Sequence, residues 1–244
     1  MNVDVVLLPK DLQPHHLESR VVVVFDVLRA TTTMAAALAA GVGEIRVFGD
    51  LAAARSAAAR GGGARVLCGE ENCLPPAGFD LGNSPGAFSR ALHAGRTVYM
   101  STTNGTRAIV AAREAPVVLT GALVNAAAVA RAIATRWPRV GVTLLCAGTG
   151  GAVALEDVLG AGAVMEALAA HASIDPASDA AAIAGRLFRA ARADLRAALA
   201  ESRGGRNVVA AGLAPDVNFA SRLDSLDTVG FVEKDPLSVT PLSV

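Results

Sequence analysis

The sequence predicts an α/β fold built around a mostly parallel sheet. Short apolar runs alternate along the chain with Ala-rich segments of about ten residues, which is the pattern of βαβ units. The run VVVVF at 21–25 is apolar throughout and mostly β-branched, as expected for a strand buried on both faces. Hydrophobic residues make up 52% of the chain and aromatic residues only 4%, so Ala, Val and Leu must provide most of the core packing.

Gly, Pro and polar residues separate the expected elements. The expected strands lie at 3–8, 21–25, 45–48, 65–68, 97–100, 117–120, 140–146 and 229–232. The expected helices lie at 34–40, 51–60, 84–93, 107–113, 125–136, 155–171, 179–200 and 216–222. Ser84 and Pro85 suit the start of the third helix. A loop over 69–85 and a Gly-rich hinge, ESRGGR at 201–206, separate the other elements.

Three strand-to-helix junctions share one pattern, which bears on the domain organisation. VVVVFDVLRATTT, TVYMSTTNGT and VTLLCAGTGG each join an apolar strand to a helix through small polar residues or glycines. The pattern is compatible with a single α/β unit over 1–244 and with two similar lobes divided near 115–140. In either arrangement, binding groups are expected beyond the carboxyl ends of the strands.

Composition narrows the classes of partner and the cellular location. The 22 basic and 22 acidic residues cancel, and no basic stripe favours nucleic acid. The three cysteines, Cys68, Cys73 and Cys146, are too few for a disulfide scaffold. The first residues lack the pattern of a signal peptide, and charged residues interrupt the Ala-rich runs, so we expect a cytoplasmic protein without a membrane span. The low charge is compatible with a homodimer.

The segment STTNGT at 101–106 predicts an anion site at the start of a helix. Such a start exposes unpaired N–H groups and the positive end of the helix dipole. Thr102, Thr103 and Asn104 add side-chain donors, and Gly105 lets the backbone approach a ligand closely. Ordinary capping needs only one of these side chains, so we favour anion binding.

The segment FDVLRATTT at 25–33 predicts a second cluster at a strand end. Asp26 follows the buried strand, Arg29 suits a carboxylate, phosphate or sulfonate, and Thr31 adds a hydroxyl at the next helix start. An Asp26–Arg29 ion pair that locks the turn is the alternative. The aspartyl-phosphatase motif is not met, because Leu28 stands where that motif has its second Asp.

Two further segments supply carboxylates that suit Mg²⁺, a cation that binds oxygen ligands. The loop over 69–85 carries Glu70, and Asp80 there could bind metal, hold a substrate hydroxyl or form an Asx-turn. In LEDVLGAG, one of Glu156 and Asp157 compensates the helix dipole and the other reaches the site. Cys146 is interpreted as a packed residue, and the four histidines show no spacing of metal ligands.

Five motifs in one order resemble the 2-phosphosulfolactate phosphatase family over nearly the whole chain. They are DVLRATTT, GFDLGNSP, STTNGT, CAGTGG with LEDVLGAG, and DVNFASRLD. The resemblance implies a three-layer α/β/α fold and a Mg²⁺-dependent phosphatase. The implied reaction converts 2-phosphosulfolactate to 3-sulfolactate and phosphate, on the route to coenzyme M. One departure is GEENC at 69–73, where members often read GERGG, so Glu71 stands where Arg is common.

The residues and the resemblance together define the candidate site. The catalytic candidates are Asp26 and Arg29. The candidates for substrate binding are Thr31, Asn83, Ser84, Thr102, Thr103, Asn104, Gly105 and Arg206. The candidates for Mg²⁺ binding are Asp26, Glu70, Asp80, Glu156 and Asp157.

The leading hypothesis is hydrolysis of 2-phosphosulfolactate or a related phosphorylated 2-hydroxy acid. Asp26 would then act as metal ligand, general base or nucleophile, and the sequence leaves these roles open. Two alternatives remain: another Mg²⁺-dependent reaction of phosphorylated hydroxyacids, and a non-catalytic protein that binds anions.

Overall fold

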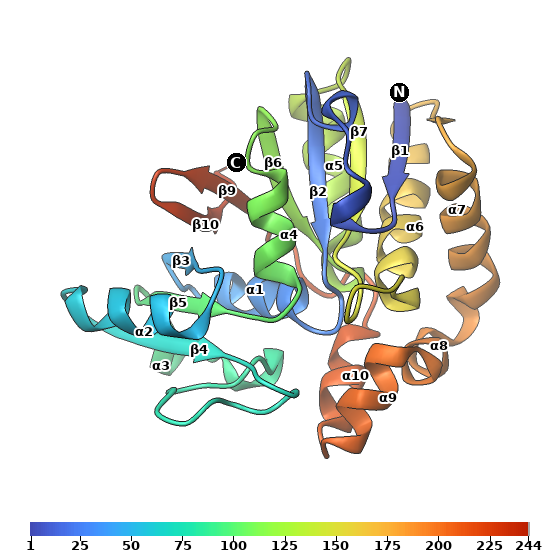
Figure 1. Ribbon diagram of the computed structural model, residues 1–244. Coiled ribbons are helices and arrows are strands. Elements are labelled where there is room, and N and C mark those ends of the chain that lie inside the picture. The colour runs from blue at the N-terminus through green and yellow to red at the C-terminus, as the bar shows by residue number, and fades with distance from the viewer. Residues whose placement is uncertain (244) are drawn as a thin grey trace.

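The structure, a computed structural model that describes residues 1–243, is organised around one ten-stranded sheet (Figure 1). The strand order is β4-β5-β3-β10-β9-β6-β2-β7-β1-β8. The strands are β1 (Asn2–Val6), β2 (Arg20–Phe25), β3 (Glu44–Val47), β4 (Arg65–Gly69), β5 (Thr97–Ser101), β6 (Val117–Gly121), β7 (Gly141–Cys146), β8 (Asp175–Pro176), β9 (Gly230–Lys234) and β10 (Leu237–Pro241).

Two parallel groups of strands make up most of the sheet, as the sequence predicts. One group is β4-β5-β3 and the other is β6-β2-β7-β1-β8. The hairpin of β9 and β10 lies between them, antiparallel to β6 on one side and to β3 on the other. Strand β10 was not expected from the sequence. The division into two lobes near 115–140 remains a prediction.

Helices cover both faces of the sheet, which confirms the three-layer α/β/α fold. The helices are α1 (Ala30–Ala39), α2 (Leu51–Arg60), α3 (Arg90–His93), α4 (Gly105–Ala112), α5 (Ala126–Arg136), α6 (Leu155–Ala169), α7 (Asp179–Ala191), α8 (Leu195–Glu201), α9 (Arg203–Ala210) and α10 (Ala214–Ala220). Side chains of β2 alternate between two cores: Val23 packs with α5 and α6, whereas Val24 packs with α1 and α4. None of the helices within residues 1–243 has the length and apolar character needed to cross a bilayer.

The predicted hinge at 201–206 is wrong, because this segment begins helix α9. Ser202 caps the helix by accepting a hydrogen bond from Gly205 N at 2.9 Å. The glycines serve close packing, since a Cβ on Gly204 would overlap Glu156 Oε1 and one on Gly205 would overlap the carbonyl oxygen of Leu199.

Two other predicted helices are divided in the structure. The one expected at 84–93 is a 3₁₀ turn, Pro85–Ala87, followed by the short α3. Ser84 does not cap it, because its hydroxyl is bonded to Asp216. The one expected at 179–200 breaks into α7 and α8 at the 3₁₀ turn Arg192–Asp194, where Asp194 caps α8.

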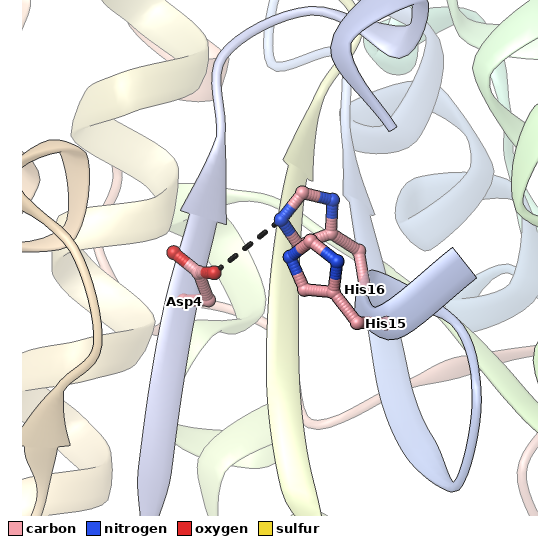
Figure 2. Close-up of side chains that lie close together, drawn as sticks. All are labelled: Asp4, His15 and His16. Atoms are coloured by element: carbon pink, nitrogen blue, oxygen red, sulfur yellow. Dashed lines mark ion pairs between the residues drawn. The ribbon is translucent and has the colours of Figure 1, made fainter. Parts of the chain in front are cut away.

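Asp4 of β1 meets His15 and His16, which precede β2 (Figure 2). The Nε2 atom of His16 lies 3.5 Å from Asp4 Oδ2, and its Nδ1 accepts a hydrogen bond from Gln13 N at 2.9 Å. A neutral His16 ring therefore carries its proton on Nε2, directed at Asp4, and has no free nitrogen lone pair for a metal ion. We interpret this cluster as a polar contact that fastens the segment before β2 to β1.

Candidate active site

A cavity of about 260 Å³ lies at the carboxyl ends of strands from both parallel groups. Its walls come from the segments that follow β2, β4, β5 and β7, and from α9. Seven of the residues predicted from the sequence line it: Asp26, Arg29, Glu70, Asn83, Thr102, Thr103 and Asn104. The two strand groups converge here, because a Cβ built on Gly105 would lie only 2.8 Å from Asp26 Oδ2.

Asp26 is buried at the end of β2, where hydrogen bonds fix both its backbone N–H and its carboxylate. Its Oδ1 accepts a hydrogen bond from Ala30 N at 3.1 Å, and its own N–H donates to Thr31 Oγ1 at 3.1 Å. Thr31 thus fixes the turn instead of lining the cavity. Burial raises the pKa of Asp26 from 3.8 to about 7, and the nearby charges of Glu156 and Glu70 act in the same direction.

Glu156 and Asp157 are both buried at the start of α6, but their carboxylates differ in what they contact. Asp157 accepts from Val27 N at 2.8 Å and from Gly148 N at 2.9 Å, so it joins two turns and has both oxygens engaged. Burial raises the pKa of Asp157 well above its ordinary value, and the charges of Asp26 and Glu156 add to this. Within residues 1–243, Glu156 Oε2 has no hydrogen-bond partner.

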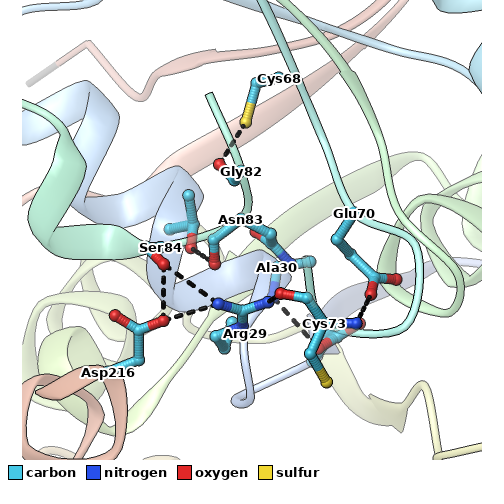
Figure 3. Close-up of polar contacts among 11 residues, drawn as sticks. Arg29, Ala30, Cys68, Glu70, Cys73, Gly82, Asn83, Ser84 and Asp216 are labelled. Atoms are coloured by element: carbon cyan, nitrogen blue, oxygen red, sulfur yellow. Dashed lines mark hydrogen bonds and ion pairs between the residues drawn. The ribbon is translucent and has the colours of Figure 1, made fainter. Parts of the chain in front are cut away.

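The STTNGT turn holds an anion supplied by the protein itself. Glu70 Oε1 accepts from Thr103 N at 3.0 Å and from the Thr103 hydroxyl. Glu70 Oε2 accepts from Cys73 N at 3.0 Å (Figure 3). Thr102 and Thr106 bond to each other at the start of α4. The anion in this turn is thus a carboxylate of the protein, whereas the sequence predicted a site for a ligand, and Asn104 lines the cavity beside it.

Arg29 is buried and bonded to three residues from two segments, the loop that follows β4 and helix α10 (Figure 3). Its Nη1 donates to Asp216 Oδ2 at 2.6 Å and to Ser84 Oγ at 3.1 Å, and its Nη2 donates to the carbonyl oxygen of Cys73 at 2.6 Å. Ser84 also donates to Asp216 Oδ2 at 2.7 Å. The ion pair of Arg29 is thus made with Asp216 of α10, a residue that the sequence reasoning missed although it lies in the motif DVNFASRLD.

Seven candidates from the sequence are absent from the cavity lining: Thr31, Asp80, Ser84, Gly105, Glu156, Asp157 and Arg206. Asp80 accepts from Leu67 N at 2.7 Å and borders a different hollow. Arg206 donates to the carbonyl oxygen of Glu201 and is exposed. Gly105 is packed against Asp26 beside the cavity, as described above. The exposed Glu71, which departs from the family pattern, is also absent from the lining.

One wall of the cavity was not predicted, because it belongs to the segment interpreted as a hinge. Arg203, Gly204, Asn207 and Val208 of α9 line it together with Thr149 and Gly150. Arg203, Gly204, Asn207 and Val208 share one face of the helix, because residues four positions apart lie above one another. Ser202 as an N-cap is the sequence signal that could have predicted this helix.

The described residues include oxygen atoms of the kind that bind a hard cation. Glu156 Oε2 and Asn83 Oδ1 are buried without hydrogen-bond partners in the described part of the chain. Asp26 Oδ2 lies next to Gly105, at the cavity. Buried carboxylates that are close enough to raise one another's pKa are strongly stabilised by a bound cation.

Comparison with known proteins identifies the family of this chain. A family model described as 2-phosphosulpholactate phosphatase matches residues 6–235. A probable 2-phosphosulfolactate phosphatase of Synechococcus sp. (strain CC9605) is 39% identical over 229 residues, covering 91% of this chain and 90% of the relative. One from Carboxydothermus hydrogenoformans is 36% identical, covering 94% of this chain and 92% of the relative. The chain therefore belongs to the 2-phosphosulpholactate phosphatase family, a family of phosphoric monoester hydrolases.

Proposed function

We propose that this protein is a Mg²⁺-dependent phosphatase that hydrolyses 2-phosphosulfolactate or a related phosphorylated 2-hydroxy acid to the hydroxy acid and phosphate. The observation that carries the proposal is the buried carboxylate of Asp26 at a polar cavity where two groups of parallel strands converge. Two further buried carboxylates, Glu156 and Asp157, lie outside the lining, and the charges of Glu156 and Asp26 raise the pKa of Asp26 and Asp157 respectively. The names of the relatives support the substrate. The proposal includes a cytoplasmic location and a place on the route to coenzyme M.

The donor set fits Mg²⁺ better than it fits a softer metal. The oxygens without partners belong to a carboxylate and an amide, Glu156 Oε2 and Asn83 Oδ1, and Mg²⁺ favours such oxygen ligands. Asp26 and Glu156, with the Asn83 carbonyl, would hold the ion. Asp157 would position them, because both its oxygens accept backbone N–H groups. Glu70 has both oxygens bonded and would contribute mainly charge.

When bound, Mg²⁺ would offset the charge of the phosphate oxygens and help to activate water. The protein's own groups then orient the substrate. Asn104 would hold the phosphoryl group beside Asp26. The hydrogen bond from Ala30 N to Asp26 Oδ1 fixes the carboxylate, so one defined oxygen faces the reacting atoms. From this place Asp26 can serve as ligand, general base or nucleophile.

The proposed function predicts phosphate release that depends on Mg²⁺. Purified protein should release inorganic phosphate from 2-phosphosulfolactate or 2-phospholactate with Mg²⁺, and excess EDTA should abolish the release. Phosphorus NMR of the products distinguishes hydrolysis from transfer or isomerisation, since only hydrolysis yields inorganic phosphate as the sole phosphorus product. Failure of the wild-type protein to release phosphate from any phosphorylated 2-hydroxy acid with Mg²⁺ would contradict the proposal.

The packing of α9 on Glu156 gives a second test. Gly204→Ala should lower the affinity for Mg²⁺ and the turnover by about 10-fold or more, because the new Cβ overlaps Glu156 Oε1 and must displace the carboxylate or the helix. Calorimetric titration with Mg²⁺ and the phosphate assay measure both effects. Gly212→Ala is a control for glycine loss near the end of α9, since a Cβ there meets nothing within 4 Å, although its φ of +79° adds backbone strain. Equal Mg²⁺ affinity of G204A and wild type would argue against Glu156 as a ligand.

A further inference from the structure

Two arginines line the cavity, and they differ in how far their guanidinium groups are already engaged within the protein. Arg29 is 4% exposed, and its Nη atoms already donate to Asp216, Ser84 and Cys73. The charge of Asp216 offsets the charge of Arg29 within the protein. Arg29 is therefore better suited to hold the walls of the cavity together than to bind an anionic substrate.

Arg203 has the opposite character. It is exposed at the cavity, and no carboxylate lies within 4.0 Å of its guanidinium among the residues that the structure describes. Its recorded hydrogen bond is a long one, from Nη1 to the carbonyl oxygen of Thr149 at 3.3 Å. Most of its five N–H donors are consequently available.

The glycine turn after β7 sets the position of this guanidinium. A Cβ on Gly150 would lie 3.4 Å from Arg203 Nη2, so the guanidinium rests against the backbone of the turn. Gly150 has a φ of +61°, a conformation that favours glycine. The CAGTGG segment thus provides a surface on which Arg203 lies.

The charges around the cavity show what Arg203 would bind. Asp26 and Glu70 line the cavity, and Glu156 lies directly behind Gly204 and Thr149. These carboxylates would repel a second anionic group on a phosphorylated substrate. The guanidinium of an arginine can donate two parallel hydrogen bonds to the oxygens of a carboxylate or sulfonate. At the wall formed by α9, the charge of Arg203 would offset this repulsion.

We propose that Arg203 binds the carboxylate or sulfonate of the substrate and makes the enzyme selective for phosphoesters that carry a second acid group. This inference rests on the proposed phosphatase function and adds its specificity-determining residue. Asn207, one helical turn further along α9, lines the same wall and adds an amide beside the guanidinium.

The test compares 2-phospholactate with 2-phospholactamide, in which a neutral amide replaces the carboxylate. Arg203→Ala should raise KM for 2-phospholactate roughly 10- to 100-fold, change kcat little and leave KM for the amide unchanged. Arg203→Lys should restore part of the affinity, because it keeps the charge but loses the bidentate fork. Equal losses on both probes in R203A, or no loss on either, would overturn the inference.

Two further variants sharpen the comparison. Arg196→Ala removes an exposed arginine of α8 outside the cavity and should match the wild type. Arg206→Ala tests the arginine that the sequence favoured, and a selective loss there in place of R203A would also overturn the inference.

A binding experiment separates this inference from the proposed function. Calorimetric titration of 3-sulfolactate into the Mg²⁺-loaded protein needs no turnover. Weaker binding by R203A alone supports the role of Arg203, whereas equal affinity in R203A and wild type, or no binding to wild type, overturns it. Absence of phosphate release by the wild type would contradict the phosphatase proposal while this titration still tests Arg203.

Discussion

Asp26→Asn is expected to lower kcat by roughly 10²- to 10⁴-fold and, without Mg²⁺, to make the protein more stable than the wild type. The loss of activity follows from the position of the carboxylate at the cavity floor, whichever of the three roles it has. The gain in stability follows from its burial among other acids. When a functional site lowers the stability of a protein in this way, removing its charge commonly makes the protein more stable.

The pH dependence of this stability effect has a definite direction. The pKa of Asp26 is raised from 3.8 to about 7, so the unfolded chain loses the proton first as pH rises. Ionisation therefore favours unfolding between about pH 4 and pH 7, by up to the order of 4 kcal/mol in total. In EDTA, the melting temperature of D26N should exceed that of wild type by a margin that is small near pH 4 and largest above pH 7.

Mg²⁺ should reverse the difference, because the cation stabilises the ionised cluster. The increase in melting temperature of the wild type on adding Mg²⁺ should be larger at pH 8 than at pH 5. Asp80→Asn is the matched comparison: it changes a carboxylate that lies outside the cavity, and its turnover should stay within a few-fold of wild type. Wild-type turnover in D26N would contradict the assignment of Asp26.

The same variant divides the roles of Asp26. Loss of Mg²⁺ affinity identifies a metal ligand. Full affinity with no turnover identifies a general base or nucleophile, and a trapped phosphoenzyme in the wild type then distinguishes the nucleophile.

Features that depend on neighbours in the chain could be predicted from the sequence. Short stretches of sequence are enough to predict the burial of β2, the turn that follows it and the polar start of α4. These stretches carry Asp26, Thr102, Thr103 and Asn104, which line one cavity. The predicted sheet edge is the reason that they meet, because parallel strands bring their carboxyl ends to one side.

Features that depend on distant segments could not be predicted. The hydrogen-bonded pair of Arg29 and Asp216 joins residues 187 positions apart, and no local pattern marks it. The choice between the adjacent Glu156 and Asp157 depends on the backbone N–H groups of Val27 and Gly148, which come from two other turns. The glycines of α9 indicate flexibility when taken alone, and only the packing against Glu156 and Leu199 explains them.

Arg29→Met is expected to lower the free energy of unfolding by about 3–5 kcal/mol, because it leaves Asp216 buried without its cation. The Arg29 and Asp216 side chains are only 3% and 8% exposed, and the guanidinium also bonds the loop carrying Cys73 and Ser84. For a chain of this size the melting temperature should fall by about 6–20 °C. Denaturant unfolding and thermal melting measure the effect.

A double-mutant cycle separates the ion pair from the rest of this network. Asp216→Leu combined with Arg29→Met should be less destabilising than the sum of the single changes, because no buried charge is left unpaired. Arg131→Ala provides the surface comparison: its pair with Asp227 is 54% and 93% exposed, so its removal should cost less than about 1 kcal/mol. Strict additivity in the cycle would show that Arg29 acts through its bonds to Ser84 and Cys73 alone. A coupling of 1 kcal/mol or more, on the order expected for contacting residues, would show that the pair itself ties α10 to the start of α1 and so fixes the cavity wall.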